Sequence, residues 1–243
     1  SMMSYLFDTV NLPRPLVFDE LSMACSAGDV DLVKQVLKRR FVDVNRPNKS
    51  GCPPLIVACA SGHTRIVELL MENPYLDINA IDMAGDTGLH KASRRGSVTM
   101  VKAILRDGRV LINLRSNRER TPLHEVCDSG GNLQIVELLL ERGAVATSVD
   151  ADMNTPLHLA SKNGYIDIVR HLLDHCPGTK IDNRAVNFVC TFDRDVVLTE
   201  FLNRCNDKLP ECEKGMSWFK LSAYTGNLRC LVVFMKRRLD NIE

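Results

Sequence analysis

The chain has 243 residues, of which 25% are charged, and its formal net charge at pH 7 is only +1. So small a net charge argues against wholesale binding to nucleic acid or to a membrane surface. No apolar run approaches the roughly 18 residues that a membrane span needs. These limits leave a large single domain or an elongated array of repeats.

Residues 1–18 are interpreted as an irregular N-terminal extension. Pro13 and Pro15 interrupt scattered apolar residues there, and the basic-then-apolar order of a signal peptide is missing. Ser1-Met2, ahead of Met3, is interpreted as a cloning remnant. Leu16 and Phe18 are expected to pack on the segment that follows.

A short motif then returns every 34 residues. Its copies read Pro53-Pro54-Leu55-Ile56, Thr87-Gly88-Leu89-His90, Thr121-Pro122-Leu123-His124 and Thr155-Pro156-Leu157-His158. Four evenly spaced copies indicate an array in which each repeat is one supersecondary unit.

The last copy shows what the unit is. Thr155 is a favourable N-cap, and Pro156 takes the first helical position, where a missing N–H costs nothing. Gly164 is expected to end this short helix. The apolar stripe of a second, amphipathic helix follows at Ile166, Val169, Leu172 and Leu173. Each helix–turn–helix unit can bury its apolar face only against its neighbours.

The run Thr155-Pro156-Leu157-His158-Leu159-Ala160 matches the signature T-P-L-H-x-A, and nearly the whole chain resembles the ankyrin-repeat family. The resemblance implies an all-α solenoid of about seven helix–turn–helix repeats with short hairpin loops. The repeats are expected approximately at residues 19–47, 48–81, 82–115, 116–149, 150–180, 181–209 and 210–243.

Several repeats depart from the motif. The first has Glu20 and Ser22 in place of the proline and histidine, which suits a terminal cap. In the fourth, Gly130-Gly131 predicts one extra residue in the turn between the helices. The sixth is expected to be shortened in a loop, with helices around residues 186–190 and 196–202. In the seventh, which is the other expected cap, Trp218 is expected in the core.

No catalytic, cofactor or metal site is predicted. His90, His124 and His158 recur at the repeat period, so neighbouring copies stand roughly 10 Å apart, the spacing of packed helices. That is too far to share a metal with bonds near about 2 Å. Each is expected to bond locally across the turn before its own helix. No nucleophile–base pair or phosphate-binding loop is seen, so no enzyme is expected.

The cysteines are expected to be free thiols. Cys25, Cys59, Cys127 and Cys190 occupy a slot that takes small buried residues, and no C-x-x-C pair occurs. Free thiols predict a reducing compartment, cytoplasmic or nuclear.

The resemblance implies that a partner meets the hairpin tips and the face of the first helices. On this chain the candidate partner-binding residues are Met83, Asp86, Arg94, Arg95, Asn117, Arg118, Arg120, Asp128, Asn154, Lys162, Phe192 and Tyr224. The arginines lie at the centre and the aromatic residues toward the C-terminus, which favours an acidic or hydrophobic-acidic protein segment. The alternative is a solvated surface of balanced charges.

Asn45, Asn79 and Asn113 also recur at the repeat period. Their side chains are expected to bond the backbone of the connecting hairpins, as asparagine does in turns. The resemblance further implies that such asparagines can be hydroxylated by a dioxygenase, and Asn45 is the best candidate.

We therefore expect a monomeric, non-catalytic scaffold or adaptor that binds an acidic segment of a partner protein on the concave groove of its repeats. Two alternatives stay open. The chain can be the recognition module of a larger multidomain enzyme or signalling protein. It can also bind phosphoproteins or nucleic acid through the central arginines, in which case binding would depend steeply on salt.

Overall fold

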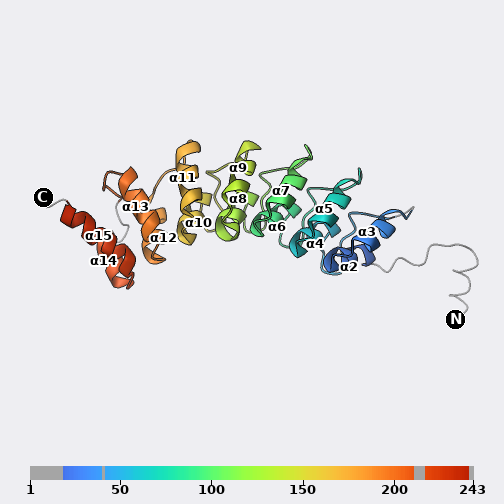
Figure 1. Cartoon of the computed structure of the whole chain (residues 1–243), viewed down its shortest axis with the longest axis horizontal. Helices are drawn as coiled ribbons and strands as arrows, with labels where there is room; N and C mark the ends of the chain where they lie inside the picture. The colour runs from blue at the N-terminus through green and yellow to red at the C-terminus, as the bar shows by residue number, and fades with distance from the viewer. Residues whose placement is uncertain (1–18, 40–41, 211–216, 241–243) are drawn as a thin grey trace, which may run out of the picture. The chain divides into compact units, whose positions relative to one another are not determined.

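The computed structural model describes residues 19–39, 42–210 and 217–240, and all the regular secondary structure in these ranges is helical (Figure 1). The predicted all-α class is therefore confirmed. Residues 1–18, with the expected packing of Leu16 and Phe18, lie outside the described residues. None of the described helices has the length and apolar character that a membrane crossing requires.

The chain divides into two compact units. Among the described residues, the N-terminal unit comprises 19–39, 42–92 and 99–111, and the C-terminal unit comprises 93–98, 112–210 and 217–240. The helices of the N-terminal unit are α2 (Glu20–Ala27), α3 (Val30–Leu37), α4 (Pro54–Ser61), α5 (Thr64–Met71) and the larger parts of α6 (Gly88–Arg94) and α7 (Val98–Leu105). Here α2 packs on α4, and α3 packs on α5.

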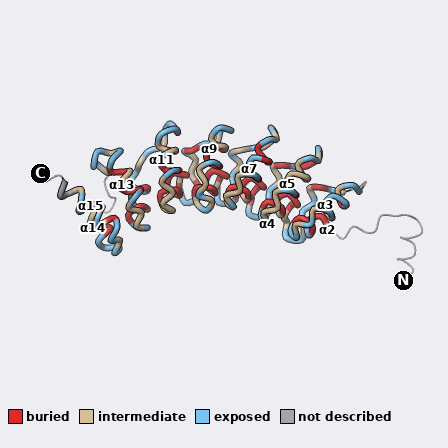
Figure 2. Tube along the Cα trace, in the orientation of Figure 1, coloured by how far each residue is buried: buried red, intermediate tan, exposed pale blue. Residues whose placement is uncertain are grey.

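The C-terminal unit continues the same plan. Its helices are α8 (Pro122–Glu125), which runs into the π-helix η1 (Val126–Gly130), then α9 (Leu133–Glu141), α10 (Pro156–Asn163), α11 (Ile166–His175), α12 (Asn183–Thr191), α13 (Asp195–Arg204), α14 (Trp218–Tyr224) and α15 (Leu228–Asp240). The first helices α8, α10, α12 and α14 form one row, and the second helices α9, α11, α13 and α15 form another. Buried residues concentrate where helices face one another (Figure 2).

Local chemistry sets the ends of the first helices as the sequence predicts. Thr155 caps α10 by accepting a hydrogen bond from His158 N at 3.4 Å, while Thr155 N donates to His158 Nδ1 at 3.0 Å. Gly164 ends the helix in the left-handed region, with φ of 78°. The expected small-residue slot is also present, because Cys25, Cys59, Cys127 and Cys190 are all 0% exposed.

The extra residue of the fourth repeat does not lie in the turn, where the sequence analysis put it. The helix itself absorbs it by widening into η1, which ends at Gly130, and Gly131 follows in the left-handed region. A Cβ on Gly130 would lie 2.5 Å from the carbonyl oxygen of Ser93. The bulge therefore brings the helix against the backbone of residues 93–96, and only glycine fits there.

The two C-terminal helix pairs form although they lack the motif. α12 and α13 cover the two helical segments expected in the sixth repeat. Trp218, expected in the core, is 8% exposed, and its indole N–H donates to the carbonyl oxygen of Pro210 at 2.6 Å.

Candidate functional site

The periodic histidines support the hairpins, as expected. His124 Nδ1 accepts from Thr121 N at 3.2 Å, so Nε2 carries the proton and faces the carbonyl oxygens of Ser148 and Asn154, both at 3.1 Å. Burial lowers the pKa of His124 below its ordinary value of 6.5, although these two carbonyl groups oppose the shift. Among the described residues, no group of three or more histidine, cysteine or acidic side chains is placed to hold a metal ion.

The periodic asparagines join successive hairpins. Asn113 Nδ2 donates to the carbonyl oxygen of Gly143 at 2.9 Å, and Asn113 Oδ1 accepts from Val145 N at 3.0 Å. Asn45 makes the same pair of bonds in the N-terminal unit, to Tyr75 O and from Asp77 N, both at 2.7 Å. The expected bonding to hairpin backbone is confirmed, and hydroxylation of Asn45 stays a prediction.

The hairpin tips share one backbone shape. Gly51, Gly85, Glu119 and Met153 follow one another at the repeat period, and all four have positive φ, from 57° to 74°. Just before this position, the tip of the fourth repeat exposes Asn117 and Arg118. Each tip therefore presents side chains on a rigid turn, which suits contact with a partner.

Two of the four candidate arginines neutralise carboxylates of their own chain. Arg94 Nε lies 2.7 Å from Oε2 of Glu125, whose side chain is only 2% exposed. Arg120 lies 2.7 Å from Asp128 and 3.4 Å from the buried Asp150. Burial disfavours the charged guanidinium of Arg120, but its bond to Asp128 and the neighbouring carboxylates outweigh burial and raise its pKa. These ion pairs hold Arg94 and Arg120 against the fold.

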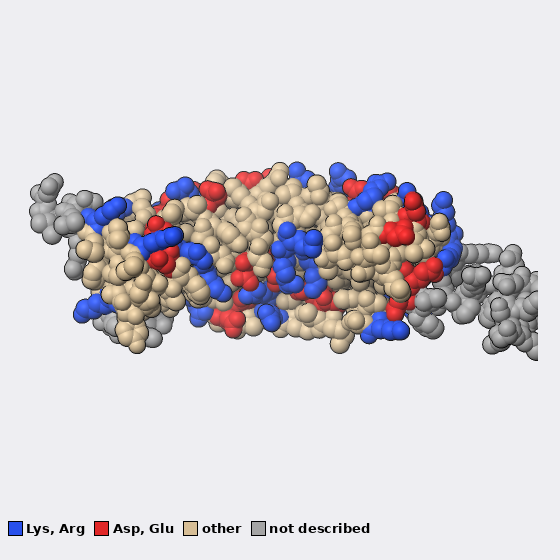
Figure 3. Space-filling model, turned by 60° about the horizontal axis from the view of Figure 1, so that its bottom comes forward, with Lys and Arg blue, Asp and Glu red and all other residues tan. Residues whose placement is uncertain are grey.

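Arg95 and Arg118 are more exposed than Arg94 and Arg120. Arg95 follows the last residue of α6, Arg118 lies in a hairpin tip, and both are exposed. The carbonyl oxygen of Arg118 accepts from Ala151 N at 2.9 Å, which ties its backbone to the next hairpin. Figure 3 shows Lys and Arg side chains beside Asp and Glu on the visible face, and not an uninterrupted basic surface.

The candidate residues of the N-terminal unit also differ in exposure. Met83 is 78% exposed on its hairpin, whereas Asp86 is 3% exposed. Lys91 Nζ contacts both Asp82 at 2.7 Å and Asp86 at 2.8 Å. Burial acts to lower the pKa of Lys91, but the hydrogen bonds to the two carboxylates act more strongly in the opposite direction. The pKa of Lys91 is therefore raised. Asp86 is therefore mainly a structural partner of Lys91.

Asn154 takes a similar structural role in the C-terminal unit. It is 6% exposed, and its Oδ1 accepts from Arg184 at 3.0 Å. Asn154 N donates to Asp150 Oδ1 at 2.8 Å, which closes the hairpin turn. Its side chain therefore holds neighbouring repeats together.

The aromatic candidates lie on the first-helix row. Lys162 Nζ lies 5.5 Å from the centre of the Phe192 ring, and Phe188 and Phe192 are 6.1 Å apart. Phe192 is 41% exposed, and Tyr224, the last residue of α14, is 86% exposed. These side chains offer apolar contact area at the C-terminal end of the row.

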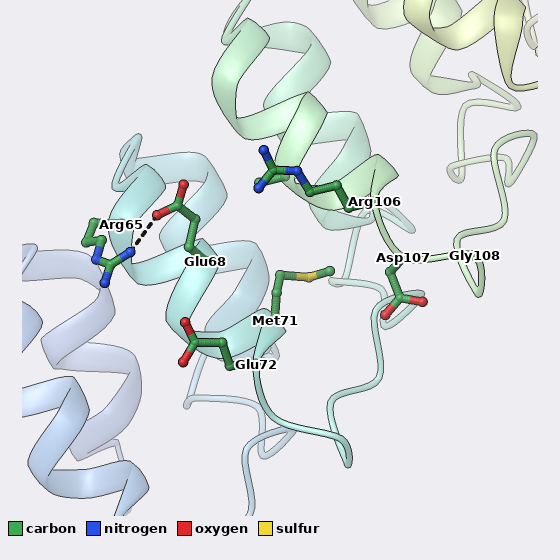
Figure 4. A pocket seen from close by; sticks show the side chains of 8 residues that line it. Arg65, Glu68, Met71, Glu72, Arg106, Asp107 and Gly108 are labelled. Carbon is green, nitrogen blue, oxygen red and sulfur yellow. Dashed lines mark hydrogen bonds and ion pairs between the residues drawn. The ribbon is translucent and has the colours of Figure 1, made fainter.

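A shallow groove of about 680 Å³ lies on the second-helix side of the N-terminal unit (Figure 4). Met71 and Ala103 provide its apolar surface, while Arg65 and Glu68 are paired with each other at 2.9 Å. Arg106 and Glu72 add charges of both signs. Mixed charge without enclosure gives this groove no clear ligand preference.

The acidic partners of the central arginines were not predicted from the sequence. Glu125 follows the motif histidine, at the position that the buried Leu159 takes in the next repeat. A charged residue at a core position is the signal that could have indicated a buried ion pair. Which arginine would pair with it depends on contacts between residues about 30 positions apart.

Comparison with known proteins agrees with the geometry. The family model for ankyrin repeats matches residues 21–115 and 89–185, which together span more than half of the chain. No curated protein matches the chain. The family match, the paired helices and the hairpin-capping motif give one answer for the fold, an all-α repeat solenoid. The chain belongs to the ankyrin-repeat family.

Proposed function

We propose that this chain is a non-catalytic scaffold or adaptor that binds an acidic segment of a partner protein. Ankyrin repeats are generally protein–protein interaction modules. The observation that carries the acidic preference is the exposure of the Arg95 and Arg118 side chains in the C-terminal unit. An arginine fork binds carboxylates in a bidentate manner.

The paired arginines support this proposal indirectly. Arg94 and Arg120 pair with Glu125, Asp128 and Asp150, so their charge is balanced by carboxylates of the same fold. We expect Phe192 and Tyr224 to provide apolar anchors for the same segment, because both are exposed on the first-helix row. Asn117 and Lys162 would contact the same partner segment.

The test is an affinity pull-down from cell lysate at low and moderate salt, read by mass spectrometry. It compares the wild type with Arg95→Glu/Arg118→Glu. The control Lys180→Glu/Lys208→Glu makes the same charge change at two other exposed lysines of the C-terminal unit. We expect a partner that the first variant loses and the control keeps. Identical partners in all three samples would contradict the acidic-segment proposal.

The phosphoprotein or nucleic-acid alternative uses the same arginines and differs in its salt dependence. Binding that weakens by roughly one power of salt per phosphate neutralised would favour it. A role as the recognition module of a larger enzyme or signalling protein is compatible with the same surface. All eight cysteines that the structure describes are free, which supports a reducing compartment, cytoplasmic or nuclear.

A further inference from the structure

The helix α15 exposes an apolar stripe on its outward side. Leu228, Val232 and Met235 are 70%, 47% and 54% exposed. They are four and then three residues apart, so they lie on one face of the helix. Cys230, on the opposite face, is fully buried where α15 packs on α13 and α14. The exposed end face of a repeat array is normally polar, for solubility, and these three apolar side chains depart from that rule.

The preceding helix pair shows what normally covers this face. Arg194 and Asn227 are equivalent, because each donates its N–H to the carbonyl oxygen five residues earlier. Leu202 and Met235 each come eight residues after these positions (202 − 194 and 235 − 227). Leu202 is 3% exposed and Met235 is 54% exposed. α15 packs on α13, and no described helix follows α15. The exposed stripe is thus the surface on which a further helix would pack.

The charges beside the stripe indicate what kind of helix would pack on α15. Adjacent second helices are joined by ion pairs, such as Arg170 of α11 with Glu200 of α13 at 2.9 Å, and Asp174 of α11 with Arg204 of α13 at 2.7 Å. On α15, Arg229 and Lys236 are seven residues apart and both exposed, so they form a basic edge beside the stripe. Neither forms an ion pair within the described part of the chain.

We propose that the outward face of α15 binds an amphipathic helix of a partner protein, with an apolar stripe flanked by Asp or Glu. This site lies on the second-helix row, so it is separate from the surface proposed above and does not depend on it. A second copy of this chain is a poor occupant. Antiparallel two-fold pairing of two α15 helices would place both basic edges on the same side, where like charges repel.

The test uses a displayed library of amphipathic helices of roughly 20 residues, long enough to form a helix on binding. Each member keeps a leucine stripe, and the flanking positions vary among Glu, Gln and Lys. The full chain is the bait, in wild-type form and as Arg229→Glu/Lys236→Glu. We expect the wild type to enrich Glu flanks and the charge-reversed variant to enrich Lys flanks. A selected Glu helix should bind that variant about tenfold more weakly, since two exposed ion pairs are lost.

A second variant, Leu228→Gln/Val232→Gln/Met235→Gln, tests the stripe itself and should abolish binding of the selected helix. Met83→Gln is the control, because Met83 is also an exposed apolar side chain, at 78%, but lies in the N-terminal unit. If the triple variant is unfolded by circular dichroism, Val232→Gln alone replaces it. Three results would overturn the proposal: no acidic enrichment on the wild type, binding that survives loss of the stripe, or a dimer in sedimentation that the stripe variant abolishes.

Discussion

Arg94 and Glu125 form an ion pair at 2.7 Å although 31 residues separate them, and the glutamate side chain is almost fully buried. A buried carboxylate that loses its partner keeps its desolvation cost. Arg120, at 4.0 Å, is a second cation near Glu125 and a more distant one. The pair therefore locks the end of α6 to α8 within the C-terminal unit.

We expect Arg94→Gln to lower the free energy of unfolding by about 1–3 kcal/mol, because Glu125 is left buried beside a weaker partner. Adding Glu125→Gln should recover part of that loss. Urea denaturation of the wild type, both single variants and the double variant completes a double-mutant cycle. Strictly additive effects would show that the pair does not couple in solution.

Gly130→Ala should destabilise the chain by about 1–3 kcal/mol, the usual cost of overpacking. Its new Cβ would lie 2.5 Å from the backbone oxygen of Ser93, which has no rotamer by which to move away. Gly108→Ala is the control, since nothing lies within 4 Å of its added Cβ. Thermal unfolding followed by circular dichroism compares them, and equal melting temperatures for the two variants would rule out the close approach.

Met153→Gly should raise the melting temperature by about 2–4 °C. Met153 has φ of 62°, a left-handed conformation that costs a side-chain-bearing residue roughly 1–2 kcal/mol, while the same tip position is glycine in two other repeats. Its side chain is 61% exposed, so little packing is lost. Scanning calorimetry is the measurement. A fall in melting temperature would mean that the backbone strain is smaller than the entropy that glycine adds to the unfolded chain.

Stability should fall as pH drops below about 6.5, in part because of His124. Its pKa is lowered in the folded chain, so the unfolded chain takes up the proton first. The contribution of His124 is therefore complete above the unfolded pKa and is lost as pH falls toward the folded pKa. Urea denaturation gives the free energy of unfolding at about pH 7.5 and about pH 5.5. The free energy should change less between these two pH values for His124→Asn than for the wild type. The exposed His175→Asn variant is the control, and an unchanged difference in His124→Asn would refute the assignment.

If Asn45 is hydroxylated, this residue should carry one added oxygen atom when the chain is isolated from cells that contain the dioxygenase. Peptide mass spectrometry locates it, and Asn79 serves as an internal comparison because it makes the equivalent hairpin bonds at 2.9 Å. An unmodified Asn45 in that preparation would remove the prediction.

The sequence by itself determined the repeating unit and the ends of its helices. The cap that Thr155 and His158 form spans three residues, and helical hydrogen bonds span four. Because these interactions are local, the spacing of residues in the sequence is enough to predict the helix ends. The motif also located the hairpin tips where Arg118 and Met83 are exposed. Helix pairs without the motif could still be predicted from their apolar stripes.

Only the tertiary structure decided which carboxylates hold Arg94 and Arg120. Arg94, Arg95, Arg118 and Arg120 look alike in the sequence, yet two of them are held by carboxylates roughly one repeat away. The same holds for α15, where Met235 and its counterpart Leu202 differ in exposure because a further helix pair covers only one of them. The physical reason is that burial and ion pairing arise between repeats, from side chains some 30 residues apart, and no local pattern specifies which of several candidates will meet.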